Sequence, residues 1–279
     1  MTDWPRTYVE WTDGDTAYIS VPFTWDLPAV YQRAVWLRAS GYKVRAGGPA
    51  VMLMPKYLSD VADTAGEVDA LPRHNPDAVF TSRGCVRRCP FCAVWRIEGE
   101  LRELEDWEPR PIVCDNNLLA CSMAHFDRVI DRLKPLSGVD FNQGLDARLL
   151  TKHHADRLGE LNCIVRLAWD WTPLESEFRK AVAMLRKGGT PKSRMRVYVI
   201  IGYKDTPEDA LYRLQAVRGM GLMPNPMRYN PLDVLRRDNY VGENWTDDLL
   251  RQYMRYWANL RFTAAVPFNE WLERYGLAA

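Results

Sequence analysis

Long hydrophobic runs are missing from this sequence of 279 residues, which has no stretch of about 18 apolar residues that could cross a membrane. Its first ten residues, MTDWPRTYVE, lack the basic-then-apolar order of a signal peptide. An excess of charge of one sign is also missing, because 37 Lys and Arg oppose 36 Asp and Glu. The sequence therefore predicts a cytoplasmic protein with no membrane partner and no general attraction to polyanions.

A disulfide framework is not expected either, because the cytoplasm is reducing. The chain has six cysteines, of which Cys85, Cys89 and Cys92 lie within the stretch SRGCVRRCPFCA. Cysteines that cluster in such a protein indicate metal binding, redox chemistry or catalysis. The other three, Cys114, Cys121 and Cys163, lie in apolar surroundings and are expected to be small buried hydrophobic residues.

The apolar content of 47% and the charged content of 26% are those of an ordinary globular protein. An apolar run from residue 16, a helical pattern over residues 28–40 and a strand pattern over residues 42–46 predict one β-α-β unit. Gly47-Gly48-Pro49 ends this unit, and a segment rich in Pro and Gly follows as an expected linker to about residue 75.

Six short apolar runs, each followed by an amphipathic helix, occupy the next part of the chain. The expected strands cover residues 78–81, 111–114, 139–142, 163–168, 196–201 and 223–229. The apolar stripe of Phe126, Val129, Ile130 and Leu133 predicts a helix that ends by Pro135, and a second helix is expected over residues 173–187. Thr206 is the expected N-cap of a third helix, with Pro207 in its first turn.

Strands that alternate with helices favour parallel β-α-β units with right-handed crossovers. The predicted fold class is α/β, as a partial (β/α)6 barrel whose functional groups lie at the carboxyl ends of the strands. A small N-terminal β-α-β segment (residues 1–75) would precede the barrel (residues 76–235). A helical extension (residues 236–279) would follow, with expected helices over residues 246–262 and 267–275 and Thr246 as an N-cap.

The spacing Cys-x3-Cys-x2-Cys supplies three thiolates from one loop. Structural zinc sites and ferredoxin-type clusters both require four ligands, and no nearby His or Cys completes such a set, which disfavours both. Three cysteines suit a four-iron, four-sulfur (4Fe-4S) cluster that leaves one iron open to another ligand. With Phe91 directly before the last cysteine, the motif resembles the signature of the radical S-adenosylmethionine (radical SAM) enzymes.

The resemblance implies a fold and a chemistry. In that family the cysteine loop follows the first strand of a partial (β/α) barrel. S-adenosylmethionine binds the open iron, and the cluster cleaves it reductively to a 5′-deoxyadenosyl radical that abstracts hydrogen from a substrate. An external electron donor of the flavodoxin or ferredoxin type is implied, and the substrate could be a small molecule, a peptide or a nucleobase. A non-catalytic iron-sulfur or zinc-binding module is the alternative.

Residues 77–232 resemble the branch of this family that is often fused to a cobalamin-binding domain. The resemblance rests on TSRGCVRRCPFC, DNNLLA, VDFNQGLDARLL and VYVIIGYKDTPEDAL. It implies that Phe91 and Gly202 lie beside the adenosine of S-adenosylmethionine. Where many members carry a Gly-Gly-Glu-like turn, this chain has Asp115-Asn116-Asn117, which is expected to hold the methionine amine.

Gln143 and Arg166, at the third and fourth barrel strands, are candidates for ribose or carboxylate contacts, and Asp170 follows the fourth strand. Cobalamin is not expected, because the N-terminal segment is far shorter than a cobalamin-binding domain and lacks an Asp-x-His-x-x-Gly motif. The arginines around the cysteines (Arg83, Arg87, Arg88 and Arg96) are expected to neutralise the cluster and to pair with the acidic run over residues 98–108. A nucleic-acid partner is therefore not favoured.

Overall fold

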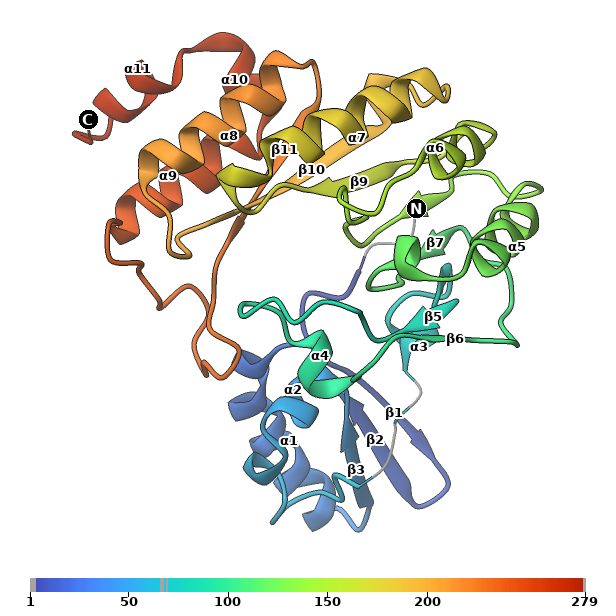
Figure 1. Ribbon diagram of the computed structural model, residues 1–279. Helices are drawn as coiled ribbons and strands as arrows, with labels where there is room; N and C mark the ends of the chain where they lie inside the picture. The colour runs from blue at the N-terminus through green and yellow to red at the C-terminus, as the bar shows by residue number, and fades with distance from the viewer. Residues whose placement is uncertain (1–3, 66–67, 69, 278–279) are drawn as a thin grey trace. The chain divides into compact units, whose positions relative to one another are not determined.

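A computed structural model describes residues 4–65, 68 and 70–277 of the chain. Its architecture is mixed α/β with several small sheets (Figure 1). The chain forms two compact units, an N-terminal unit of Met1–Arg110 with Asn230–Asn239 and a C-terminal unit of Pro111–Tyr229 with Tyr240–Ala279. Among the described residues, no helix is long and apolar enough to cross a membrane.

The N-terminal unit contains a three-stranded sheet. β1 (Val9–Asp13) pairs antiparallel with β2 (Thr16–Ser20), and β2 pairs parallel with β3 (Lys43–Gly47). α1 (Leu27–Ala39) makes the crossover between β2 and β3, which confirms the predicted β-α-β unit. β1 was not predicted, although Asp13-Gly14 between two β-prone runs is a hairpin signal, and Gly14 has the required positive φ of 56°.

The expected linker after residue 48 is packed against the rest of this unit rather than extended. Leu58 and Val61 belong to the same buried core as Ile19 and Val30, and the segment then returns alongside β3, where Asp63 forms a parallel bridge with Arg45. Residues 66, 67 and 69 lie outside the described residues. The remaining elements of the unit are η1 (Thr24–Asp26), α2 (Pro49–Leu53), η2 (Pro55–Tyr57), α3 (Leu71–His74), β4 (Ala78–Val79), β5 (Ser82–Arg83), α4 (Val94–Ile97) and β6 (Arg102–Glu103).

The C-terminal unit alternates strands and helices in chain order. Its strands are β7 (Ile112–Val113), β8 (Asp140–Phe141), β9 (Val165–Ala168), β10 (Met195–Ile201) and β11 (Met223–Arg228). Its helices are η3 (Leu118–Ala120), α5 (Met123–Leu133), α6 (Lys152–Gly159), η4 (Thr172–Leu174), α7 (Glu175–Lys187), η5 (Lys192–Arg194), α8 (Pro207–Gly219), α9 (Asp247–Trp257), α10 (Leu260–Ala265) and α11 (Phe268–Glu273).

The strands named above run parallel. β7 pairs with β8, β9 pairs with β10, and β10 pairs with β11, while a parallel bridge between Asp140 and Ile164 lies between β8 and β9. All six strands predicted after residue 77 are present, β4 being the first, although several are shorter than expected. Within the described residues the strands do not close into a barrel.

The predicted helix caps are confirmed. The Thr206 hydroxyl accepts the Asp209 N–H at 3.2 Å, and the Thr246 hydroxyl accepts the Leu249 N–H at 3.1 Å. Phe126, Val129, Ile130 and Leu133 form the buried face of α5, as the apolar stripe predicted. One expectation was wrong, because the single helix over residues 246–262 is divided into α9 and α10.

The packing of Tyr256 accounts for this division. Its hydroxyl donates to the Val266 carbonyl at 2.6 Å, and its ring contacts Phe268 and Trp271 of α11. The chain after α9 therefore turns back so that α11 can cover the aromatic side chains of α9.

The boundaries of the two units differ from the expected three segments. Residues 230–239 belong with the N-terminal unit, where the Thr24 hydroxyl donates to the Val234 carbonyl at 2.6 Å. The segments 1–75, 76–235 and 236–279 stay a prediction about modules, which compactness alone does not test.

Candidate functional site

The cysteine loop of the N-terminal unit is closed at its base by two short strands. Ser82 and Arg83 of β5 pair antiparallel with Glu103 and Arg102 of β6. Inside the loop, the Arg83 guanidinium lies 3.0 Å from the carboxylate of Glu98, whose side chain is only 9% exposed. This ion pair confirms that Arg83 contacts the acidic run, and the other Glu98 oxygen accepts the Gly84 N–H at 2.8 Å.

Gly84, directly before Cys85, can only be glycine in this conformation. Its φ is +75°, a region that residues with a side chain rarely adopt. A Cβ atom at this position would lie 2.1 Å from the Glu100 carbonyl oxygen, which belongs to the returning side of the loop. The absence of a side chain thus lets the two sides of the loop approach each other beside the first cysteine.

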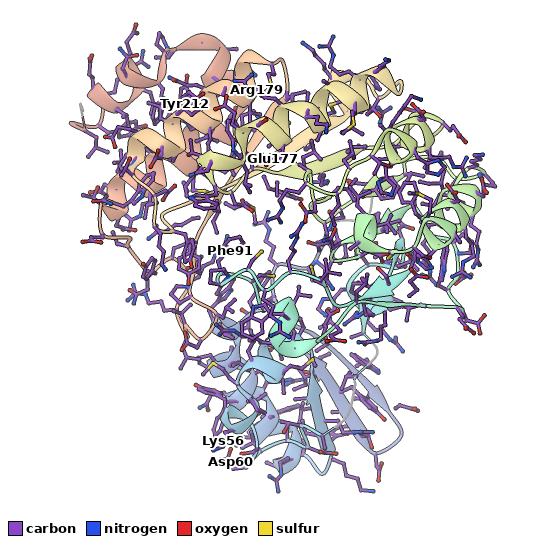
Figure 2. The ribbon with its side chains drawn as sticks, viewed as in Figure 1. Lys56, Asp60, Phe91, Glu177, Arg179 and Tyr212 are labelled. Carbon is purple, nitrogen blue, oxygen red and sulfur yellow. The ribbon has the colours of Figure 1, made fainter. Side chains whose placement is uncertain are left out.

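Cys85, Cys89 and Cys92 are half-buried and form no disulfide. The Arg87 N–H donates to the Cys85 sulfur at 3.3 Å. The Cys89 carbonyl accepts both the Cys92 N–H at 3.0 Å and the Trp95 indole N–H at 3.1 Å, which fixes the course of the backbone between the last two cysteines. Phe91, labelled on this loop in Figure 2, is half-buried.

The donor chemistry of the loop fits an iron-sulfur cluster. Three thiols on one irregular segment, with a backbone N–H directed at one sulfur, suit a ligand that is stabilised by thiolates and by hydrogen bonds to sulfur. No three His, Cys, Asp or Glu side chains in the described part of the chain are placed to hold a single metal ion. A cubane cluster presents its irons at separate corners, so its ligands need not converge on one point.

The other cysteines are buried, as predicted. Cys114, Cys121 and Cys163 are 3%, 9% and 1% exposed. Burial raises the pKa of the Cys163 thiol to about 12, which keeps that residue protonated and unreactive at neutral pH.

The other predicted cofactor residues belong to the C-terminal unit, where all of them except Arg166, which lies within β9, follow a strand. Asp115, Asn116 and Asn117 follow β7, with Asp115 and Asn117 almost fully buried at 4% and 3% exposure. Gln143 follows β8 and is exposed. A buried carboxylate and a buried amide at a strand end can orient a polar ligand group, whereas the Gln143 side chain is not held inside the fold.

Arg166 lies within a polar network rather than at a strand end. Its Nε and Nη2 atoms donate to the two carboxylate oxygens of Asp140 at 2.8 and 2.6 Å, and its Nη1 donates to the Tyr198 hydroxyl at 3.0 Å. The Tyr198 hydroxyl in turn donates to the Asn142 carbonyl at 2.9 Å. The ion pair with Asp140 raises the pKa of Arg166, and these contacts favour a structural role in joining β8, β9 and β10.

Gly202 follows β10 with a φ of +80°. A Cβ atom here would meet Leu250 of α9 at 3.1 Å. The Gly202 N–H donates to Asp205 Oδ1 at 2.9 Å, and the carbonyl oxygen lies so close to Gly242 that a Cβ there would be 2.7 Å away. The turn therefore needs glycine for its own packing, whatever it binds.

A polar network around the turn after β10 was not predicted from the sequence. Arg213 of α8 is 1% exposed, and its Nη2 lies 2.6 Å from the Asp205 carboxylate. Its Nη1 donates to the carbonyls of Trp169 and Asp170 at 3.2 and 2.8 Å. A single buried arginine thus joins the end of β9 to the turn after β10. An arginine on the buried face of a predicted helix was the available signal.

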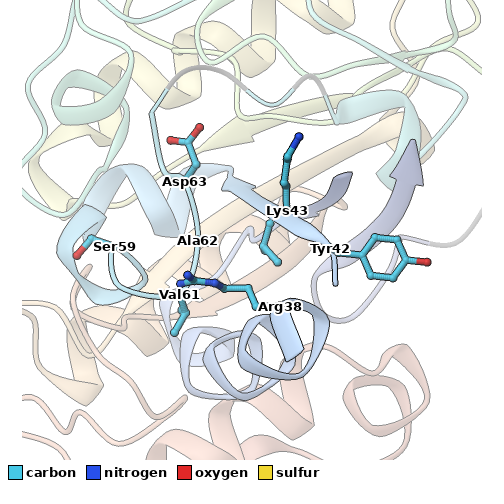
Figure 3. Close-up of a pocket in the computed structure, with 8 residues that line it drawn as sticks. Arg38, Tyr42, Lys43, Ser59, Val61, Ala62 and Asp63 are labelled. Atoms are coloured by element: carbon cyan, nitrogen blue, oxygen red, sulfur yellow. The ribbon is translucent and has the colours of Figure 1, made fainter. Parts of the chain in front are cut away.

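A pocket of about 480 Å³ in the N-terminal unit lies at the start of β3, the opposite end of that strand from α2 (Figure 3). Its charged side chains are engaged with neighbours, since Lys43 pairs with Asp15 and Asp63 lies 3.6 Å from Arg45. The Arg38 guanidinium donates to the Asp60 carbonyl. This pocket is separate from the cysteine loop, and its charges give no preference for a ligand.

Comparison with known proteins identified no relative of this chain. No protein-family model matches the chain, and no curated protein and no solved structure is significantly similar to it.

Proposed function

We propose that the protein is a radical SAM enzyme whose substrate is a small molecule, a peptide or a nucleobase. The observation that carries this proposal is the cysteine loop, in which three half-buried thiols lie on a segment closed by β5 and β6 and shaped by Gly84. The parallel order of β7 to β11, with helices between them, supports a partial (β/α)6 barrel as the scaffold.

The residues of the cysteine loop have defined roles in this proposal. Cys85, Cys89 and Cys92 would hold a 4Fe-4S cluster, which when bound would supply the one electron that cleaves S-adenosylmethionine into methionine and a 5′-deoxyadenosyl radical. The Arg87 N–H stabilises the Cys85 thiolate through its hydrogen bond to sulfur. Arg83 is paired with Glu98, so it contributes little net charge to the loop.

Each unit has its own residues for S-adenosylmethionine in this proposal. In the N-terminal unit, Phe91 contacts the adenosine. In the C-terminal unit, Gly202 contacts the adenosine, and Asp115, Asn116 and Asn117 orient the amino-acid part. Gln143 is available for the ribose because its side chain is exposed. Arg166 acts indirectly, by holding β8, β9 and β10 in register through Asp140 and Tyr198. An electron carrier of the flavodoxin or ferredoxin type reduces the cluster.

The test is anaerobic reconstitution with iron and sulfide, reduction with dithionite and addition of S-adenosylmethionine. The proposal predicts brown protein that forms 5′-deoxyadenosine. Cys85→Ala should lose both the bound iron and the product, because one of three ligands is missing. Cys121→Ala, at a buried cysteine outside the loop, should retain both.

Two results would contradict the proposal. Protein that binds a cluster and forms no 5′-deoxyadenosine would be a non-catalytic iron-sulfur module. Metal analysis that finds zinc in place of iron would assign the loop to a zinc-binding module instead.

A further inference from the structure

We propose that the C-terminal unit binds the phosphate backbone of a nucleic-acid duplex through a basic surface at the amino ends of β10 and β11. The basic surface consists of Lys180, Arg186, Lys187, Lys192, Arg194 and Arg218. None of these six residues belongs to the predicted cofactor-binding set, and the inference does not depend on the proposed function.

Most of the basic surface comes from a part of the sequence that has cations and no acids. Residues 178–203 include seven Lys and Arg and no Asp or Glu. Acidic residues elsewhere offset this run, so the net charge of the whole chain is only +1. The expectation against a nucleic-acid partner came from that net charge and from the arginines of the cysteine loop, neither of which bears on this surface.

The fold brings these cations to one end of the C-terminal unit. α7 ends with Arg186 and Lys187, and the chain then passes through η5, which begins with Lys192, into the amino end of β10. A Cβ atom at Gly221, in the turn between α8 and β11, would lie 3.3 Å from Lys192 Nζ. The Lys192 side chain therefore lies beside the end of α8, whose last turn carries Arg218.

Lys180 extends the basic surface along α7. It precedes Lys187 by seven residues, or about two helical turns, so the two exposed lysines lie on one side of the helix about 10 Å apart. Phe178, Val182 and Leu185 form the buried side of the same helix.

The cations of the basic surface have no carboxylate partners. In the part of the chain that the structure describes, none of the six forms an ion pair. The carboxylates of the neighbouring α6 and its C-cap already have partners, since Asp156 pairs with Lys152, and Glu160 pairs with Lys134 and Arg157. The basic surface is therefore not neutralised from this side.

Helix dipoles offset only a small part of this charge. Arg186, Lys187 and Arg218 lie in the last turns of α7 and α8, where a cation stabilises the helix. Each helix end carries about half a negative charge, so about five of the six positive charges remain uncompensated.

The lack of exposed apolar side chains on the basic surface favours a duplex as the partner. No large exposed hydrophobic residue lies within residues 178–204. Tyr212 of α8 is exposed, but its hydroxyl contacts Glu175 at the opposite end of α7 (Figure 2).

The other anionic partners require apolar contacts. Membrane-binding helices insert apolar side chains, protein interfaces have aromatic or aliphatic anchors, and single-stranded nucleic acids stack on aromatic rings. A duplex can be bound by cations alone, because its phosphates place one negative charge on about every 1.7 Å of the helix axis.

The test measures binding of a DNA duplex of about 20 base pairs and arbitrary sequence to the full-length protein, by fluorescence anisotropy in about 50 to about 200 mM KCl. Affinity should fall as salt rises, and six phosphate contacts predict a slope of about −5 for log K against log salt. Arg186→Gln combined with Lys187→Gln should weaken binding about tenfold and make this slope smaller by about 2. Lys192→Gln combined with Arg218→Gln should have a similar effect from outside the α7 pair.

Lys152→Gln combined with Arg251→Gln is the matched control. Both residues are exposed cations of the same unit, and each pairs with an Asp four residues away on its own helix. This variant loses the same number of positive charges, but none from the basic surface. Its affinity for the duplex should stay within about twofold of that of the parent protein, because salt screens distant exposed charges.

Equal duplex affinity of the parent protein and both surface variants would overturn the inference, as would a parent protein that binds no duplex in about 50 mM KCl. Tighter binding of a single strand of the same length, or of vesicles that contain phosphatidylserine, would assign the surface to a different partner and also overturn it. Cys85→Ala should bind the duplex as the parent protein does, so this result is independent of the cofactor chemistry.

Discussion

The course of the cysteine loop depends on the absence of a side chain at Gly84. Gly84 and Gly99 both have a φ of +75°, and they stand on opposite sides of the loop. They differ in what surrounds them. A Cβ at Gly84 meets the backbone of Glu100, whereas a Cβ at Gly99 meets nothing within 4 Å. A comparison of these two glycines therefore distinguishes the free-energy cost of a positive φ from the cost of a steric clash with the Glu100 backbone.

Replacement of each glycine by alanine tests this distinction. Gly99→Ala should lower the free energy of unfolding by roughly 1–2 kcal/mol, the strain of a left-handed residue that has a side chain. Gly84→Ala should cost more, because the Glu100 backbone must move, and should reduce iron retention after reconstitution. The measurements are denaturant unfolding and iron content per chain. Equal effects of the two variants would contradict the close approach.

The three clustered cysteines could be identified from the sequence because spacing alone carries the signal. The role of Arg166 could not be predicted from the sequence, because an arginine in a strand can contact either a ligand or a buried carboxylate. Its pairing with Asp140 depends on two strands that are 26 positions apart in the chain.

Arg213 joins three elements of the C-terminal unit. It lies on α8, pairs with Asp205 in the turn after β10, and donates to two carbonyls at the end of β9. The Asp205 carboxylate also accepts the Gly202 N–H and the Trp245 indole N–H. Burial raises the pKa of Asp205 and lowers that of Arg213, and the charge of each partner opposes this effect of burial on the other.

Removal of one partner should therefore be strongly destabilising. Arg213→Met leaves the Asp205 carboxylate without its cation and should lower the free energy of unfolding by about 3–5 kcal/mol. Adding Asp205→Asn should recover part of this loss, because the buried charge is then gone. Denaturant unfolding of the single and double variants measures the coupling. A loss below about 1 kcal/mol for Arg213→Met would show that the pair is not needed.

Helices were easier to predict than strand ends in this chain. Thr206 and Thr246 mark helix starts through local hydrogen bonds, which the sequence encodes within a few residues. The helix break after Trp257 depends on the packing of Tyr256 against α11. The segment predicted to be a linker is instead packed, because Leu58 is buried in a core formed by residues much earlier in the chain. Such contacts are tertiary and leave no local pattern.

The hydrophobic cores of the molecule do not depend on the cysteine loop. The buried residues of the N-terminal sheet and α1 include none of Cys85, Cys89 and Cys92, and β7 to β11 have buried residues of their own. The order of strands and helices was predicted from hydrophobic periodicity, which reflects these cores. The division into units was not, because it depends on which distant segments pack together.

Removal of the proposed cluster should therefore leave the chain folded. Iron-free protein should keep its far-ultraviolet circular dichroism and unfold cooperatively on heating, unlike small domains that fold only around a metal. The comparison is between reconstituted and chelator-treated samples of the same protein. Loss of secondary structure on chelation would mean that the cluster organises the fold as well as the chemistry.

The hydrogen bond from Thr24 to Val234 has a consequence for synthesis of the chain. The N-terminal unit includes residues 230–239, so its last part is translated after most of the C-terminal unit. A ribosome that has made the first 110 residues has not yet made everything that this unit contains. Folding of the unit that carries the three cysteines is thus completed late, and a single cut in the gene cannot separate it intact from the strands that follow.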